Sequence, residues 1–150
     1  MNASVRPLKE RFYTNDYDDD MLVSGEEAVR LVDETTLLVI VDVNKGEHTE
    51  CPELIELAQS IVVIDHHRQA GDAIAKAVLF YIEPYASSAS EMVAEICQYI
   101  GGGLKLRAAE AEALYAGVMI DTNYFTDKTG VRTFEAMAYL KRNGADSCLL

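Results

Sequence analysis

Two apolar runs decide the fold: "TLLVIVDVN" at residues 36–44 and "SIVVIDHHR" at residues 60–68. Both are rich in β-branched residues and apolar on both faces, which is typical of strands covered on each side of a parallel sheet. Between them, "TECPELIELAQ" at residues 49–59 predicts a helix with Pro52 in its first turn. Strand, helix and strand together predict a right-handed βαβ unit.

The rest of the chain extends this pattern. The run "AVLFYIE" at residues 77–83 follows a further connection of helical length and predicts a third strand. After Pro84 the pattern changes to helices, at residues 87–100 with Ser87 or Ser88 as the cap, at residues 108–120, and at residues 131–143 closed by Gly144. We therefore predict an α/β domain over residues 24–150, with a doubly wound parallel sheet followed by helices.

The N-terminal segment, residues 1–23, reads as a polar lead-in to this domain. Ser24 is followed three residues later by Glu27, which predicts a capping box at the start of a short helix. The acidic residues of the segment form an uninterrupted run without a turn glycine at the spacing of a calcium loop, so they predict a solvated loop. These residues are Asp16, Asp18, Asp19 and Asp20.

Composition sets broad limits on function. The 150 residues carry 13 Lys and Arg against 25 Asp and Glu, a net charge of −12, which argues against binding to duplex nucleic acid. No apolar stretch approaches the roughly 20 residues of a membrane span, and no signal peptide is visible, so we expect an intracellular piece without direct membrane contact. Cys51, Cys97 and Cys148 show no metal or disulfide spacing and are expected to be reduced packing residues.

Chemistry-bearing side chains follow the first two predicted strands. Asp42 and Asp65 end these strands, and ligands of open parallel sheets bind beyond the carboxyl ends of the strands. His66 and His67 come directly after Asp65, so carboxylates and imidazoles gather at the edge of the sheet formed by the carboxyl ends of the strands, called the rim below. Such a donor set suits Mn²⁺, Fe²⁺ or Zn²⁺ and also phosphate chemistry.

A further acid, Asp121, closes the apolar segment "ALYAGVMIDTNYFT". A carboxylate after so many buried residues needs a partner or a metal to offset its desolvation. Equally, it is an acid at the end of a helix, followed by an ordinary turn. The residues alone leave both interpretations open.

Four segments in this order resemble the DHH phosphoesterase superfamily, and within it the GdpP-type bacterial cyclic-di-AMP phosphodiesterases. They are "VIVDVN" at 39–44, "VVIDHHR" at 62–68, "YIEPYASSASEMVAEICQYI" at 81–100 and "YAGVMIDTNYFTDKTGVRTFEAMAYLKRNGAD" at 115–146. The resemblance implies a hydrolase with two Mn²⁺ ions that activate a water to attack phosphorus in a cyclic or short linear dinucleotide.

The resemblance also implies roles for single residues. Asp42 would bridge the two metals, His66 and Asp121 would bind the second metal, Asp65 would orient an imidazole, and His67 would contact the scissile phosphate. The segment "SSASE" at 87–91 matches a part of the family near the substrate, so Ser87 and Ser88 are substrate-binding candidates, although capping a helix explains them as well. Arg68 either holds a phosphate oxygen or pairs with a surface acid.

The sequence departs from the family pattern in two places. The first family motif, a His followed by closely spaced Asp residues after an opening strand, is missing, and His48 does not replace it because no strand-terminal Asp pair accompanies it. The C-terminal substrate-binding domain of the family is missing too. We therefore expect an internal piece of a larger protein that lacks most ligands of the first metal and is weak or silent alone. The parent protein would hold this domain in the cytoplasm, with membrane helices elsewhere in its chain.

The sequence leaves two alternative functions open. The domain could be another DHH phosphoesterase, acting on short RNA, phosphoadenosine phosphate or pyrophosphate, or a module that binds nucleotides without turnover. By the resemblance, the strand at residues 36–41 would also lack a neighbour on one side. An open apolar edge pairs readily with other chains, so we expect self-association along this strand.

Overall fold

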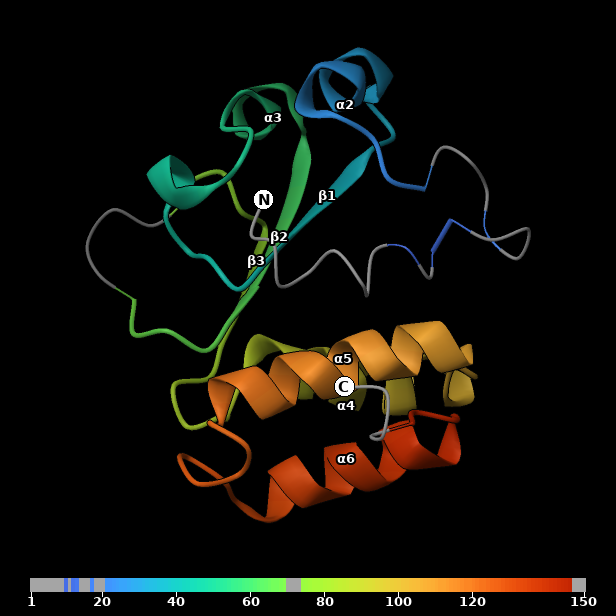
Figure 1. Cartoon of the computed structure of the whole chain (residues 1–150). Helices are drawn as coiled ribbons and strands as arrows, with labels where there is room; N and C mark the ends of the chain where they lie inside the picture. Colours follow the sequence, from blue (N-terminus) through green and yellow to red (C-terminus); the bar gives the residue numbers. More distant parts are fainter. Residues whose placement is uncertain (1–9, 11, 14–16, 18–20, 70–73, 147–150) are drawn as a thin grey trace.

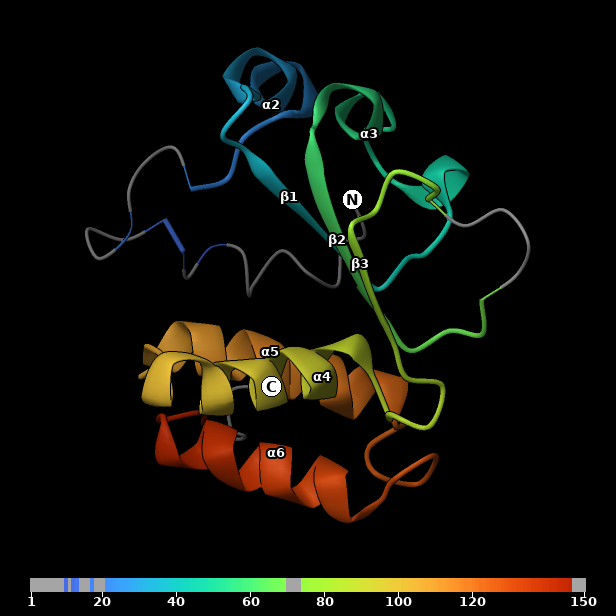
Figure 2. The same ribbon diagram turned by 180° about the vertical axis from the view of Figure 1, so that it is seen from behind.

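The computed structural model describes residues 10, 12–13, 17, 21–69 and 74–146. Its strands form one parallel sheet in the order β1-β2-β3, comprising β1 Leu37–Val41, β2 Ser60–Asp65 and β3 Leu79–Ile82. Two helices lie on one face of the sheet, α2 Gly25–Leu31 and α3 Glu53–Leu57 (Figure 1). Three lie on the other, α4 Ala89–Tyr99, α5 Ala108–Asp121 and α6 Val131–Arg142 (Figure 2). The predicted α/β fold, with helices on both faces of a parallel sheet, is confirmed.

Alternate residues of the strands face the two helical layers. Ile61 and Val63 of β2 are fully buried and pack in one cluster with Ile55 of α3. Ile64, on the opposite face of the same strand, packs with Met92 of α4. The sheet therefore separates two apolar cores, and a third core lies among α4, α5 and α6.

Helix ends follow the capping signals closely. Ser24 and Glu27 form the predicted capping box of α2, and the Ser88 hydroxyl accepts a hydrogen bond from the Glu91 amide at the start of α4. Gly144, with φ 93°, follows the end of α6. The helix expected at residues 49–59 is shorter, because its helical turns begin only after Pro52 and end at Leu57.

Other predictions meet the structure only in part. No helix occurs between β2 and β3 among the described residues 66–69 and 74–78, where the chain turns after the buried Ile74 directly into β3. Cys51 and Cys97 are free thiols. The acidic run Asp16, Asp18, Asp19 and Asp20 lies outside the described residues, as does Cys148. Within the described part, every helix is too short or too polar to cross a bilayer, and the cytoplasmic location stays a prediction.

Two short 3₁₀ helices complete the described elements, η2 Gly46–His48 and η3 Ile100–Gly102. The strand β1 pairs only with β2 within the described residues, so its other edge is unpaired there. Its side chains facing the α4 side, Leu37, Val39 and Val41, are 57%, 47% and 41% exposed. Within the described residues β1 thus combines an unpaired edge with exposed apolar side chains, and self-association along it stays a prediction.

Helices α4 and α5 pack closely against each other at Gly117. Gly117, in the middle of α5, faces Ser90 of α4 so closely that an added Cβ would lie 3.0 Å from the Ser90 Cβ and would overlap its hydroxyl. A glycine inside a helix costs roughly 1 kcal/mol relative to alanine. Here the absence of a side chain at Gly117 lets α5 pack closely on α4, so that the end of α5 lies near the residues that follow β2.

Candidate metal centre

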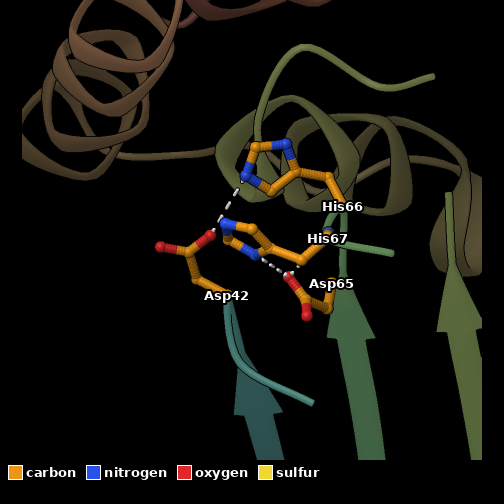
Figure 3. Close-up of side chains that lie close together, drawn as sticks. All are labelled: Asp42, Asp65, His66 and His67. Carbon is orange, nitrogen blue, oxygen red and sulfur yellow. Dashed lines mark hydrogen bonds and ion pairs between the residues drawn. The ribbon is translucent and has the colours of Figure 1, made fainter. Parts of the chain in front are cut away.

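Asp42 lies directly after β1, in a backbone conformation that few residues adopt. Its φ is 69°, in the left-handed region, and its amide donates to the Ile64 carbonyl at 2.9 Å, which continues the pairing with β2. Aspartate tolerates this conformation better than most residues. The turn directs the Asp42 side chain, which is 57% exposed, toward the histidines that follow β2 (Figure 3).

Asp65, the last residue of β2, has a fully buried side chain. Its Oδ1 accepts a hydrogen bond from the His67 amide at 3.2 Å and lies 2.7 Å from His67 Nδ1. Asp65 Oδ2 has no hydrogen-bond partner among the described residues although it is buried. The carboxylate holds the His67 ring by Nδ1, which leaves Nε2 open to a ligand.

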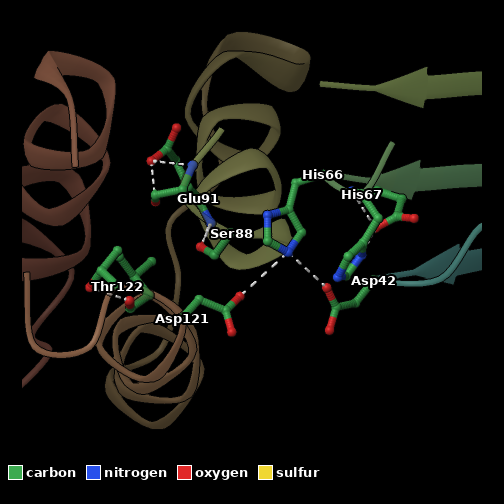
Figure 4. A network of polar contacts seen from close by, with 10 residues as sticks. Asp42, His66, His67, Ser88, Glu91, Asp121 and Thr122 are labelled. Carbon is green, nitrogen blue, oxygen red and sulfur yellow. Dashed lines mark hydrogen bonds and ion pairs between the residues drawn. The ribbon is translucent and has the colours of Figure 1, made fainter. Parts of the chain in front are cut away.

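His66 joins the sheet to the helical layer. Its side chain is 9% exposed, and its Nε2 lies 3.4 Å from Asp42 Oδ1 and 3.7 Å from Asp121 Oδ2 (Figure 4). The two carboxylates thus converge on one imidazole nitrogen from different layers of the fold. The sequence suggested both aspartates, and the structure brings them together.

Asp121 occupies an electrostatically unfavourable position for an anion. It is the last residue of α5, where the helix dipole places partial negative charge. Burial raises the pKa of its carboxyl, and the nearby Asp42 carboxylate raises it further. A cation between the two carboxylates would relieve both effects.

The donor set fits a divalent transition metal. Asp42, Asp65, His66 and His67 each offer a ligand atom, and these four atoms lie within 4.8 Å of one another. Mixed carboxylate and imidazole donors suit Mn²⁺, Fe²⁺ and Zn²⁺. Asp65 Oδ2 is buried without a hydrogen-bond partner among the described residues, and burial together with the Asp42 carboxylate raises the pKa of Asp121, so a cation at this position would be stabilised.

The other predicted site residues lie differently. Ser87 and Ser88 are buried, and both bond to Glu91: the Ser87 hydroxyl donates to the Glu91 carboxylate, while Ser88 caps the helix. Capping, which the sequence favours as the main role of these serines, is confirmed for Ser88, and the substrate contact stays a prediction for both serines. Arg68 is exposed beside the histidines and forms no ion pair with the described residues.

Sequence reasoning missed one residue beside this rim and one ion-pair group that joins the helical layer to the end of β3. Asn44 is buried, and its amide donates to the His67 carbonyl at 3.4 Å. Arg132 of α6 makes two hydrogen bonds to Glu95 of α4, at 2.7 and 2.8 Å, and lies 3.6 Å from Glu83 after β3. Hydrogen bonding to Glu95 raises the pKa of this guanidinium above its usual value. Arg132 and Glu95 are 37 residues apart, so no local sequence pattern indicates their contact. Gly117, in contrast, interrupts an apolar helix, and such a glycine is a sequence signal of close packing.

The family model for the DHH family, N-terminal domain, matches residues 3–118. The chain belongs to the DHH family. The match contains the whole rim from Asp42 to His67 and ends just before Asp121, so the structural evidence for Asp121 is its approach to His66. The DHH triplet itself is the Asp65, His66 and His67 arrangement described above.

Several DHH proteins are similar to the chain. The cyclic-di-AMP phosphodiesterase GdpP of Geobacillus thermodenitrificans is 44% identical over 128 residues, which cover 85% of this chain and 20% of that protein. The cyclic-di-AMP phosphodiesterase PdeA of Listeria monocytogenes is 40% identical over 129 residues, covering 86% and 20%. A probable manganese-dependent inorganic pyrophosphatase of Thermotoga maritima is 35% identical over 99 residues, covering 66% and 18%. The chain thus spans about a fifth of the length of these relatives.

A solved structure shares the architecture. An exopolyphosphatase-related protein from Bacteroides fragilis superposes with a TM-score of 0.70 at 24% identity, over 82% of this chain and 36% of that chain. This likeness supports the α/β fold of the described residues.

Proposed function

We propose that this domain belongs to a Mn²⁺-dependent phosphodiesterase that hydrolyses a cyclic dinucleotide, cyclic di-AMP, or a short linear dinucleotide. The observation that carries the proposal is the convergence of Asp42 and Asp121 on His66 Nε2, at 3.4 and 3.7 Å. The similarity to GdpP and PdeA, which are named as cyclic-di-AMP phosphodiesterases, supports the substrate class.

In this proposal His66, Asp121 and Asp42 would hold divalent metal, Asp42 as the carboxylate shared between the two ions that the family resemblance implies. A divalent cation supplies Lewis acidity to phosphate oxygens and to a water molecule. The protein supplies the fixed positions: Asp42 from the sheet, Asp121 from α5 and His66 between them. His66 is nearly buried, so its ring keeps one orientation.

His67 takes a different role in the proposal. Its side chain is 60% exposed, and Asp65 holds it by Nδ1. Its Nε2, which stays free because Asp65 holds Nδ1, contacts an oxygen of the scissile phosphate. Arg68, exposed next to it, adds a cationic group for the phosphate.

The test measures Mn²⁺-dependent hydrolysis of cyclic di-AMP, its linear product and pyrophosphate. Because the chain spans about a fifth of its relatives, the assay also uses a version extended by flanking sequence at both ends. We expect Asp121→Asn to lower turnover at least about 100-fold, as loss of a metal ligand should, corresponding to about 2.7 kcal/mol. Glu135→Gln, which neutralises an exposed acid on α6 away from this turn, should have little effect.

The outcomes separate the rival functions. Preference for pyrophosphate would favour the activity named for the Thermotoga relative. Nucleotide binding without hydrolysis, in both the chain and its extended version, would favour a non-catalytic module. Equal activity of the Asp121→Asn variant and the parent would overturn the assignment of Asp121 as a metal ligand.

A further inference from the structure

The turn after Asp121 has an unusual backbone. Asn123, Tyr124 and Phe125 have φ values of 45°, 55° and 66°, so three successive non-glycine residues are left-handed. Such a conformation costs roughly 1–2 kcal/mol per residue. Strain of this kind persists only where surrounding contacts impose it, and it clusters at functional sites.

Thr122 provides the contacts at the beginning of this turn. It is fully buried, and its hydroxyl donates to the Val118 carbonyl at 2.7 Å while accepting from the Phe125 amide at 3.1 Å (Figure 4). One hydroxyl therefore joins the last turn of α5 to the left-handed segment. Phe125 anchors the other end by stacking on Phe134, with ring centroids 6.0 Å apart.

The turn also satisfies the carbonyls at the end of α5. The Asn123 amide donates to the Ile120 carbonyl at 3.1 Å, and the Tyr124 amide donates to the Met119 carbonyl at 2.8 Å. Free carbonyls at a helix end would otherwise turn to water and the last turn would fray. Asp121 belongs to that last turn, so fraying would move its carboxylate relative to His66.

We infer that Thr122 is a positioning residue, whose hydroxyl holds the end of α5 in the conformation that keeps Asp121 beside His66. The inference rests on the proposed function, because the position of Asp121 matters there as a metal ligand. It goes beyond that function by assigning a role to a side chain that offers nothing to the metal itself.

The experiment measures Mn²⁺ affinity of this chain by the electron paramagnetic resonance of free Mn²⁺, and thermal unfolding without metal. We expect Thr122→Val to weaken Mn²⁺ binding about 5- to 10-fold, and Thr122→Ser, which keeps the hydroxyl, to stay within about twofold of the parent. Thr133→Val is the matched control: Thr133 is equally buried, and its hydroxyl accepts from the Gly130 amide at 3.1 Å, but it begins α6 rather than ending α5. It should lower the unfolding temperature and leave Mn²⁺ affinity unchanged.

The results distinguish this inference from the proposed function. If the parent binds Mn²⁺ and Asp121→Asn does not, but Thr122→Val binds as the parent does, Thr122 is only a structural cap and the inference is wrong. If neither the parent chain nor the extended version used in the activity assay binds Mn²⁺, the proposed metal site is wrong and the inference falls with it. Should Thr122→Val not fold, Thr122→Ala replaces it, and hydrogen exchange at residues 122–127 without metal must then be faster than in Thr122→Ser.

Discussion

The sheet and the helical layer contribute to the same site, but they are stabilised unequally. Around α4, α5 and α6 one core encloses fully buried residues from all three helices, among them Ala94, Val118 and Leu140. The sheet has its own buried centre at β2, yet the adjacent β1 keeps exposed apolar side chains and one unpaired edge within the described residues. Asp42 follows the less protected strand, whereas Asp121 ends a well-packed helix. The geometry of the site therefore depends on how firmly the helical layer is attached to the sheet.

The largest expected effect comes from separating α4 and α5. Gly117→Ala places a methyl group against Ser90, and overpacking of this kind costs roughly 1–3 kcal/mol. We expect the unfolding midpoint to fall by several degrees and Mn²⁺ affinity to weaken, because α5 must shift away from His66. Calorimetry with and without Mn²⁺ measures both.

Gly130→Ala is the control for this substitution, since an added Cβ there meets nothing within 4 Å. Because Gly130 is the N-cap of α6, where alanine is less favourable than glycine, the substitution should cost roughly 0.5 kcal/mol and leave Mn²⁺ affinity unchanged. Partial recovery of the Gly117→Ala variant by Ser90→Ala would assign the effect to this contact. An unchanged unfolding midpoint in Gly117→Ala would contradict this prediction, because it would show that α4 and α5 accept the extra methyl group with no loss of stability.

A smaller effect is expected from the ion pair that joins α6, α4 and the end of β3. Arg132→Met removes two hydrogen bonds to Glu95, and because Arg132 is 42% exposed we discount their contribution for solvent to about 1 kcal/mol. Glu56→Gln removes the charge of an exposed pair with Lys76 in the sheet half, leaves the hydrogen bonds of Lys76 to the Ile55 and Glu56 carbonyls in place, and should cost less. Urea unfolding of both variants measures the contrast. An equal loss would contradict the unequal stabilisation of the two regions.

The smallest effect on stability, within about 0.5 kcal/mol, is expected at the β1 edge. Val39→Lys should abolish the predicted self-association, because a charged residue on an edge strand opposes pairing with another chain. Leu79→Lys on β3 is the matched control and should still associate. Sedimentation velocity at high concentration decides between them. A strictly monomeric parent chain would refute the prediction.

Residues close in sequence were the predictable part of this molecule. The β-branched runs gave β1 and β2, and Ser24 and Ser88 marked the starts of two helices, because these signals act within a few residues. Asp42 and Asp65 were placed at one rim because parallel strands share their carboxyl ends. Patterns within short stretches of sequence were therefore enough to predict the metal-ligand candidates that follow the strands.

The packing between layers was not predictable in this way. From the residues alone, Asp121 was equally a metal partner or an ordinary acid at a helix end, and only the family resemblance connected it with His66. Its position depends on the contact of Gly117 with Ser90 and on the hydrogen bonds of Thr122. The contact of Gly117 with Ser90 requires the tertiary arrangement of α4 and α5, which no short stretch of sequence specifies. The hydrogen bonds of Thr122 are local, to Val118 and from Phe125, but their importance for the site follows only from the position of α5 beside His66.

The place of Asp121 at the carboxyl end of α5 has a consequence for the order in which ligands bind. Asp42, Asp65 and Asp121 present three carboxylates at this rim, and α5 adds the negative end of its dipole. A phosphate that approaches before any cation meets repulsion from all of them, within a chain of net charge −12. Binding should therefore follow a compulsory order, cation first and phosphate second. Phosphate affinity measured without divalent cations should then be negligible at low ionic strength, where this repulsion is screened least.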